Sequence, residues 1–105
     1  MTTYDLVAQA IREASNIEAT YDGHLRRLTP ISVGTKRGEP QGLFVQFAGS
    51  STSGEVPGWK CLALAKLVDV RIIPGPPHVL ATEGTQPSNC LDYVDVSIGG
   101  FSGLT

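Results

Sequence analysis

The chain has 105 residues, of which 41% are hydrophobic and 17% charged, and this suffices for one compact domain with a single core. Its formal net charge of −2 excludes a polycation that binds nucleic acid through overall charge. Residues 24–71 nevertheless hold seven basic and three acidic residues, which predicts either an anion-binding face or a set of scattered, solvated charges.

Residues 3–15 are the only convincing helix in the sequence. Apolar residues recur there at helical spacing, so they share one face, and they are Val7, Ala10, Ile11 and Ala14. Thr2 or Thr3 can cap the first turn. The apolar stripe is narrow and rich in alanine, which predicts a helix that lies close against a sheet.

Two strands joined by a tight turn follow the helix. Residues 17–21 alternate between apolar and polar, and Asp22-Gly23 is a strong hairpin-turn dipeptide. Residues 24–33 predict the second strand, in which Pro30 must lie at an edge, a bulge or a bend. Residues 34–41 are polar and predict a flexible connection.

Three apolar runs, at residues 43–48, 59–64 and 67–73, predict three strands of one meander. The loop at residues 49–58 lacks the Lys-Ser/Thr pair of a phosphate-binding loop, which excludes that nucleotide site. Val68, Val70 and Ile72 occupy alternate positions of the third run. This spacing predicts that they share one face of the strand, with Val70 in the core.

The tail differs in character from the rest. We expect residues 1–77 to form a helix plus a small barrel, and residues 78–105 to form an extension of the same domain. Residues 90–98 alternate, which predicts either an added edge strand or an arm onto a second subunit. Cys61 lies in an apolar run and is expected to be a small core residue.

Neither the N-terminus nor any apolar run indicates export or membrane insertion. The N-terminal residues do not resemble a signal peptide, and no run approaches membrane-spanning length. We therefore expect a soluble cytoplasmic protein with reduced thiols and no membrane partner.

The sequence offers no obvious catalytic machinery. His24 and His78 have no metal-ligand spacing with cysteines or acidic residues, and no nucleophile–base pair is apparent. We therefore predict a protein that is not an enzyme and needs no metal or cofactor.

An ordered series of weak motifs resembles the WYL domain, a small bacterial module with an Sm-like barrel core. The resemblance covers about residues 4–73. It runs from the helix through Ile17, Tyr21 and Gly23, then Arg26, Leu28 and Pro30, then Gly58, Trp59 and Lys60, to Leu62, Leu64, Lys66, Leu67 and Val70. It implies a mainly β fold: an N-terminal helix on a small, strongly bent, five-stranded barrel, with a C-terminal β extension added here.

WYL domains usually form the ligand-sensing part of transcription regulators and are thought to bind nucleotide-like anions. The triplet that names the family is not intact here, where Phe44-Val45-Gln46 stands on that strand, and no second helix exists for a DNA-recognition helix. If this chain is a relative, it is a standalone and divergent one.

Four residues are the candidate ligand-binding set: Tyr21, Arg26, Arg27 and Lys66. Arg26 matches the family's arginine and could hold a phosphate in bidentate fashion, or be a solvated strand charge. Tyr21 could stack on a ligand or pack in the core. Lys60 alternates with Trp59 and is expected to face away from it and to matter less.

Two functions of different classes remain. The first is a non-catalytic module that senses or sequesters a nucleotide-like or nucleic-acid ligand, with single-strand binding on the barrel face as a weaker variant. The alternative is a structural or protein-interaction subunit that homo-oligomerises through its C-terminal strand. The first needs the basic residues to converge beside Tyr21, and the second needs residues 90–98 to leave their own sheet.

Overall fold

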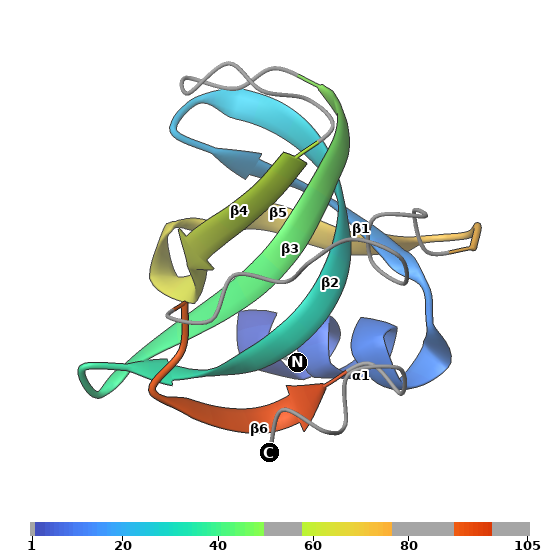
Figure 1. Cartoon of the computed structure of the whole chain (residues 1–105). Helices are drawn as coiled ribbons and strands as arrows, with labels where there is room; N and C mark the ends of the chain where they lie inside the picture. Colours follow the sequence, from blue (N-terminus) through green and yellow to red (C-terminus); the bar gives the residue numbers. More distant parts are fainter. Residues whose placement is uncertain (1, 50–57, 77–89, 98–105) are drawn as a thin grey trace.

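The computed structural model describes residues 2–49, 58–76 and 90–97. Within these residues one helix is followed by six strands of a single antiparallel sheet (Figure 1). The elements are α1 (Thr3–Glu13), β1 (Asn16–Tyr21), β2 (His24–Lys36), β3 (Glu39–Gly49), β4 (Gly58–Ala63), the 3-10 turn η1 (Leu64–Lys66), β5 (Val68–Ile73) and β6 (Tyr93–Ser97). The predicted class, mainly β with an N-terminal helix on a bent sheet, is confirmed, although the sheet has six strands and does not close into a barrel.

Helix α1 begins with a capping box. The Thr2 hydroxyl accepts from the Asp5 backbone N–H at 3.1 Å, and the Asp5 carboxylate accepts from the Thr2 N–H at 3.2 Å. Val7, Ala10 and Ile11 are buried as predicted, but the helix ends at Glu13 because Ala14 adopts a left-handed conformation with φ 52°. Ala14 is therefore an exposed cap and not part of the apolar face.

The strands are arranged in the order β4-β3-β2-β1-β5. The predicted antiparallel pairing of residues 43–48 with 59–64 is confirmed, with Val45 opposite Trp59. The predicted three-strand meander is wrong, because β5 pairs with β1 at the other edge of the sheet. The 3-10 turn η1 interrupts the chain after β4, so β5 does not return alongside it.

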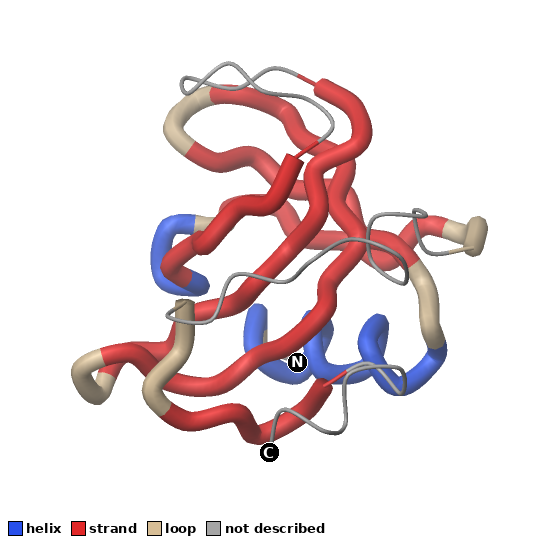
Figure 2. The backbone as a smooth tube through the Cα atoms, in the orientation of Figure 1, coloured by secondary structure: helices blue, strands red, loops and turns tan. Residues whose placement is uncertain are grey.

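Strands β2 and β3 form one long hairpin where a flexible connection was expected at residues 34–41. The ladder continues to Lys36 opposite Glu39, and only Arg37 and Gly38 form the turn. Their φ angles of 53° and 80° are those of a two-residue turn with both central residues left-handed. Figure 2 shows this turn as a short loop between two continuous strands.

Strand β2 has two partners along one edge. Residues 24–28 pair with β1 and residues 32–35 pair with β6, while β3 pairs along the other edge. Pro30 lies between the two partners, where its missing N–H is tolerated, so its expected place at a bend or bulge is confirmed. Gly34 lets β6 come close, since a Cβ there would lie 1.8 Å from the Tyr93 carbonyl oxygen.

Strand β5 carries a bulge that changes its side-chain parity. Asp69 has a φ of 54°, and the register with β1 shifts between Glu18 and Thr20. Val70 and Ile72 consequently pack against the core, half-buried, while Val68 is 53% exposed. The prediction of one shared face is therefore wrong for Val68.

Cys61 and Cys90 are joined by a disulfide, so the expected reduced thiols are wrong for this structure. Cys61 is exposed, because it alternates with the inward-facing Lys60 and Leu62, and the prediction of a core residue is wrong too. Cys90 is the buried partner, and its carbonyl oxygen accepts from the Gln41 side chain at 2.7 Å. The bond attaches the segment before β6 to strand β4.

A single apolar core lies between α1 and the sheet, and Cys90 also contributes to it. The largest fully buried apolar side chains are those of Phe44, Ile17, Leu28, Ile31, Val7, Val33 and Val45. None of the described helices is long and apolar enough to cross a membrane. Residues 50–57 of the loop expected at 49–58, and residues 78–89 of the expected extension, lie outside the described residues.

Candidate functional site

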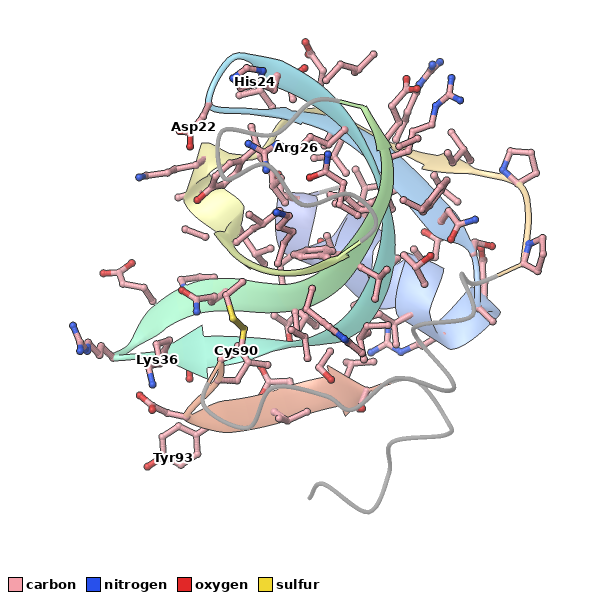
Figure 3. The ribbon with its side chains drawn as sticks, turned by 45° about the horizontal axis from the view of Figure 1, so that its top comes forward. Asp22, His24, Arg26, Lys36, Cys90 and Tyr93 are labelled. Atoms are coloured by element: carbon pink, nitrogen blue, oxygen red, sulfur yellow. A yellow bond between two sulfur atoms is a disulfide. The ribbon has the colours of Figure 1, made fainter. Side chains whose placement is uncertain are left out.

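The candidate site is at one end of the inner face of the sheet. We define the inner face by the alternate positions of β1–β4 that pair across strands: Ile17, Ala19, Tyr21, Arg26, Leu28, Phe44, Gln46, Lys60 and Leu62. Its apolar members build the core. Among its polar members, Tyr21 and Arg26 lie where β1 and β2 approach their hairpin, and Gln46 contacts Arg26. Figure 3 shows Arg26 at this end, together with Asp22 and His24, and far from Lys36, Cys90 and Tyr93.

Arg26 is the central residue of the site and is only 2% exposed. Arg26 pairs with Ala19 and lies two residues before the buried Leu28. Its side chain therefore points inward, as that of Leu28 does. The Nη1 group donates to the Gln46 side-chain oxygen at 3.3 Å. Nε and Nη2 are buried, and neither has an acceptor among the described residues. Two buried donors without partners are rare in folded proteins and call for a physical explanation.

Tyr21 lies beside Arg26, which is part of the arrangement that the ligand-binding hypothesis required. The guanidinium carbon is 5.0 Å from the centre of the Tyr21 ring, which is a cation–π arrangement. The ring is half-buried and packs against the core. Tyr21 and Gln46 thus hold the guanidinium from two sides and fix its orientation.

Arg27 does not join this site. Adjacent strand residues point to opposite faces, so Arg27 lies on the outer face, where its Nε donates to Glu18 at 3.1 Å. Arg71 donates to the same carboxylate, with its Nε at 2.9 Å. The hydrogen bond from Arg71, followed by the one from Arg27, holds the pKa of Glu18 below its ordinary value.

Lys66 is also outside the site. It lies in η1 with an exposed side chain, and among the described residues that side chain has no hydrogen-bond or ion-pair partner. The structure therefore brings together Tyr21 and Arg26 of the four predicted residues, and it separates Arg27 by face and Lys66 by element.

Lys60 and Gln46 are the site residues that sequence reasoning missed. Lys60 faces away from Trp59, as predicted, but this turns it inward, where it is 9% exposed. Because it pairs with Phe44, two residues from Gln46, it shares the inner face with Arg26. The available signal was a polar residue at an inward position of an apolar strand. Only the strand register shows which positions point inward.

No cluster of three or more histidine, cysteine or acidic side chains suited to a metal ion occurs in residues 2–49, 58–76 and 90–97. The nine inner-face positions named above carry two cations and no carboxylate. An oriented guanidinium of this kind is suited to binding an anion.

The chain matches no protein-family model, no curated protein and no solved structure.

Proposed function

We propose that this protein is a non-catalytic binding module of the WYL type that senses or sequesters a negatively charged, nucleotide-like or nucleic-acid ligand. The observation that supports this function is the buried, oriented guanidinium of Arg26 with two donors unpartnered among the described residues. Burial of a charge is costly unless it is paired, and an anionic ligand would supply the missing partner. The WYL resemblance supports the same ligand class through the match at Arg26 and Tyr21.

A titration with nucleotides and short oligonucleotides tests the proposal. We expect binding in calorimetry at low salt that weakens at moderate salt, because the contact is between charges. Arg26→Ala should weaken binding by about 1–3 kcal/mol, the scale of a hydrogen bond to a charged group. Arg27→Ala is the matched control, since it removes the same charge from the next residue on the outer face, and it should bind nearly as well as the unmodified protein.

Absence of any anion-dependent stabilisation at low salt would contradict the proposal. Equal loss of affinity in Arg26→Ala and Arg27→Ala would also contradict it, because overall charge would then explain binding. In either case the interaction subunit would be the better function. That function needs β6 to pair across an interface, whereas here β6 pairs with β2 of its own chain.

A further inference from the structure

The outer face of the sheet, opposite to the inner face, carries two of the three exposed large apolar side chains of the described residues. These are Leu25 on β2 and Val68 on β5, which are 54% and 53% exposed, while the third is Tyr93 on β6. Leu25 and Val68 both pair with Thr20 of β1, one from each side. Because paired residues of neighbouring strands point to the same face, Leu25, Thr20 and Val68 form a row across three strands, which we call the apolar row.

A bulge directs Val68 to this row. Asp69 has a left-handed backbone conformation with a φ of 54°, which costs free energy for any residue other than glycine. The register shift beside it puts Val68 on the outer face, although Val70 and Ile72 pack against the core. Bulges re-aim side chains next to binding sites, so a strained bulge that exposes a valine indicates a function for that valine.

Two arginines lie beside the apolar row. Glu18 lies two residues before Thr20 on β1 and shares its face, and it pairs with Arg27 of β2 and Arg71 of β5. The Arg27 and Arg71 side chains are 55% and 69% exposed, and both donate to the one Glu18 carboxylate. This second row, which we call the charged row, holds two positive charges and one negative charge. It is therefore complementary to one further carboxylate.

Strand β5 also offers a backbone edge. It is the last strand in the order β4-β3-β2-β1-β5, and among the described strands it pairs only with β1 (Figure 1). A further strand can therefore pair with the backbone N–H and C=O groups on its other side. Such a strand would continue both rows, with one side chain beside Val68 and another beside Arg71. The other terminal strand, β4, exposes no large apolar side chain.

We infer that the edge of β5 and the two rows are a docking surface for an extended, acidic peptide segment of a partner protein. The segment adds a strand to β5 and places an apolar side chain beside Val68 and an aspartate or glutamate beside Arg71. Its carboxylate balances the second arginine of the charged row. This surface is on the opposite face of the sheet from Arg26, so the inference does not depend on the proposed function.

Selection from a displayed library of random peptides of about eight residues, the length of one strand, tests the inference. Peptides enriched on the unmodified protein should carry aspartate or glutamate two residues from valine, isoleucine, leucine or phenylalanine, which is the spacing of Glu18 and Thr20 on β1. The dissociation constant of the most enriched peptide is then measured by fluorescence anisotropy. Moving its carboxylate by one position, to the opposite face of the strand, should weaken binding about fivefold or more.

A charge reversal with a matched control connects binding to the charged row. Arg71→Glu should weaken binding of the selected peptide about tenfold or more. Lys66→Glu makes the same change of charge at an exposed side chain of η1, outside both rows, and should change binding by about twofold or less. A peptide with lysine in place of its carboxylate should bind Arg71→Glu more tightly than the unmodified protein. This rescue excludes misfolding as the cause of the loss.

A second pair of variants tests the apolar row. Val68→Thr keeps the β-branched shape but adds a hydroxyl, and it should weaken binding about threefold or more. Tyr93→Ser removes the third exposed apolar side chain and should leave binding unchanged. Figure 3 shows Tyr93 far from Asp22 and His24, at the hairpin that leads into Leu25. Urea denaturation checks that both variants are folded.

Four results would overturn the inference. The first is a selection that enriches no peptide, and the second is a set of enriched peptides without the carboxylate and apolar pair. The third is an equal loss of affinity in Arg71→Glu and Lys66→Glu, because overall charge would then explain binding. The fourth is a dimer of the unmodified protein in analytical ultracentrifugation that Val68→Thr abolishes, which would assign the surface to a second copy of this chain.

Discussion

The Arg26 side chain combines deep burial with incomplete hydrogen bonding. This combination lowers stability, but it favours the binding of a ligand that accepts hydrogen bonds. The Arg26 guanidinium leaves water, and its polar contacts with the described residues are those to Gln46 and Tyr21. A core residue selected for stability alone would be apolar or fully paired. A residue held ready for a ligand has this incomplete pairing before the ligand arrives.

Arg26→Met should therefore remove the proposed ligand binding without destabilising the fold. We expect the free energy of unfolding to stay the same or to rise by about 1–3 kcal/mol, as when buried charges are replaced by apolar groups of similar size. Urea denaturation without ligand measures it. A decrease of several kcal/mol would show that Arg26 is a structural residue. The double variant Arg26→Met/Gln46→Leu, in which both partners of the hydrogen bond are removed, controls for an unpaired amide.

Glu18 makes stability depend on pH. Its folded-state pKa is lowered by Arg71 and Arg27, so its contribution to stability is complete above the ordinary glutamate value of about 4.3 and is lost as the pH falls through the lowered pKa. Urea midpoints measured from pH 7 to pH 3 should fall less steeply in Glu18→Gln than in the unmodified protein. The pKa of Asp92 is lowered as well, by the backbone N–H of Arg37 first, and accounts for residual acid sensitivity. Equal slopes in the two proteins would show that the Arg–Glu18 contacts do not form in solution.

The sequence named Arg26 and Tyr21 as candidates and predicted the Asp22-Gly23 turn. The hairpin that this turn forms pairs Tyr21 with His24 and Arg26 with Ala19, which puts Tyr21 and Arg26 on one face near the turn. The sequence was insufficient for Lys60, whose inward direction depends on the pairing of β4 with β3. The incomplete pairing of Arg26 among the described residues could not be predicted at all, since the choice of Nη1 as the Gln46 partner is a matter of side-chain geometry.

Among the elements, strand boundaries and directions followed from apolar runs and turn dipeptides. The helix, the β1–β2 hairpin and the β3–β4 pair were all predicted on this basis. The bulge at Asp69 was not, because a left-handed aspartate leaves the apolar pattern unchanged while reversing the parity that the pattern implies. The length of the β2–β3 hairpin was missed because its end is polar on both strands.

Gly34 should be indispensable for the β2–β6 pair. A Cβ at this position would meet the Tyr93 carbonyl oxygen at 1.8 Å, so Gly34→Ala must move one strand away from the other. We expect a loss of about 1–3 kcal/mol in the free energy of unfolding, the usual cost of overpacking. Hydrogen exchange should become faster in β6 and stay unchanged in β1. Thr35→Ala, which removes atoms from the neighbouring position, is the control, and unchanged protection of β6 in Gly34→Ala would contradict the observed pairing.

For the whole molecule, topology was the part that the sequence did not determine. Apolar runs at 59–64 and 67–73 are close in sequence, and a meander is the simplest connection between them. The actual connection carries β5 to β1 at the other edge. The disulfide was not predicted for a related reason: Cys61 and Cys90 are 29 residues apart, and only the fold brings them together.

The disulfide should contribute strongly to global stability. Closing a loop between residues 29 apart is expected to stabilise by about 3–4 kcal/mol through the entropy of the unfolded chain. Reductant should lower the denaturation midpoint accordingly. The double variant Cys61→Ser/Cys90→Ser should already be less stable and should not respond to reductant. A midpoint of the unmodified protein that ignores reductant would mean that the thiols are reduced in solution, as the sequence suggested.

The pairing of β2 with β6 also constrains the order in which the chain can fold during its synthesis. Ser32 and Ser97 pair across the two strands although 65 residues separate them. At about 5–20 residues per second, a ribosome needs on the order of 3–13 s to add those residues. Throughout that interval the part of β2 that later pairs with β6 exposes its backbone N–H and C=O groups. The nascent chain is then open to strand pairing with other nascent chains on the same polysome.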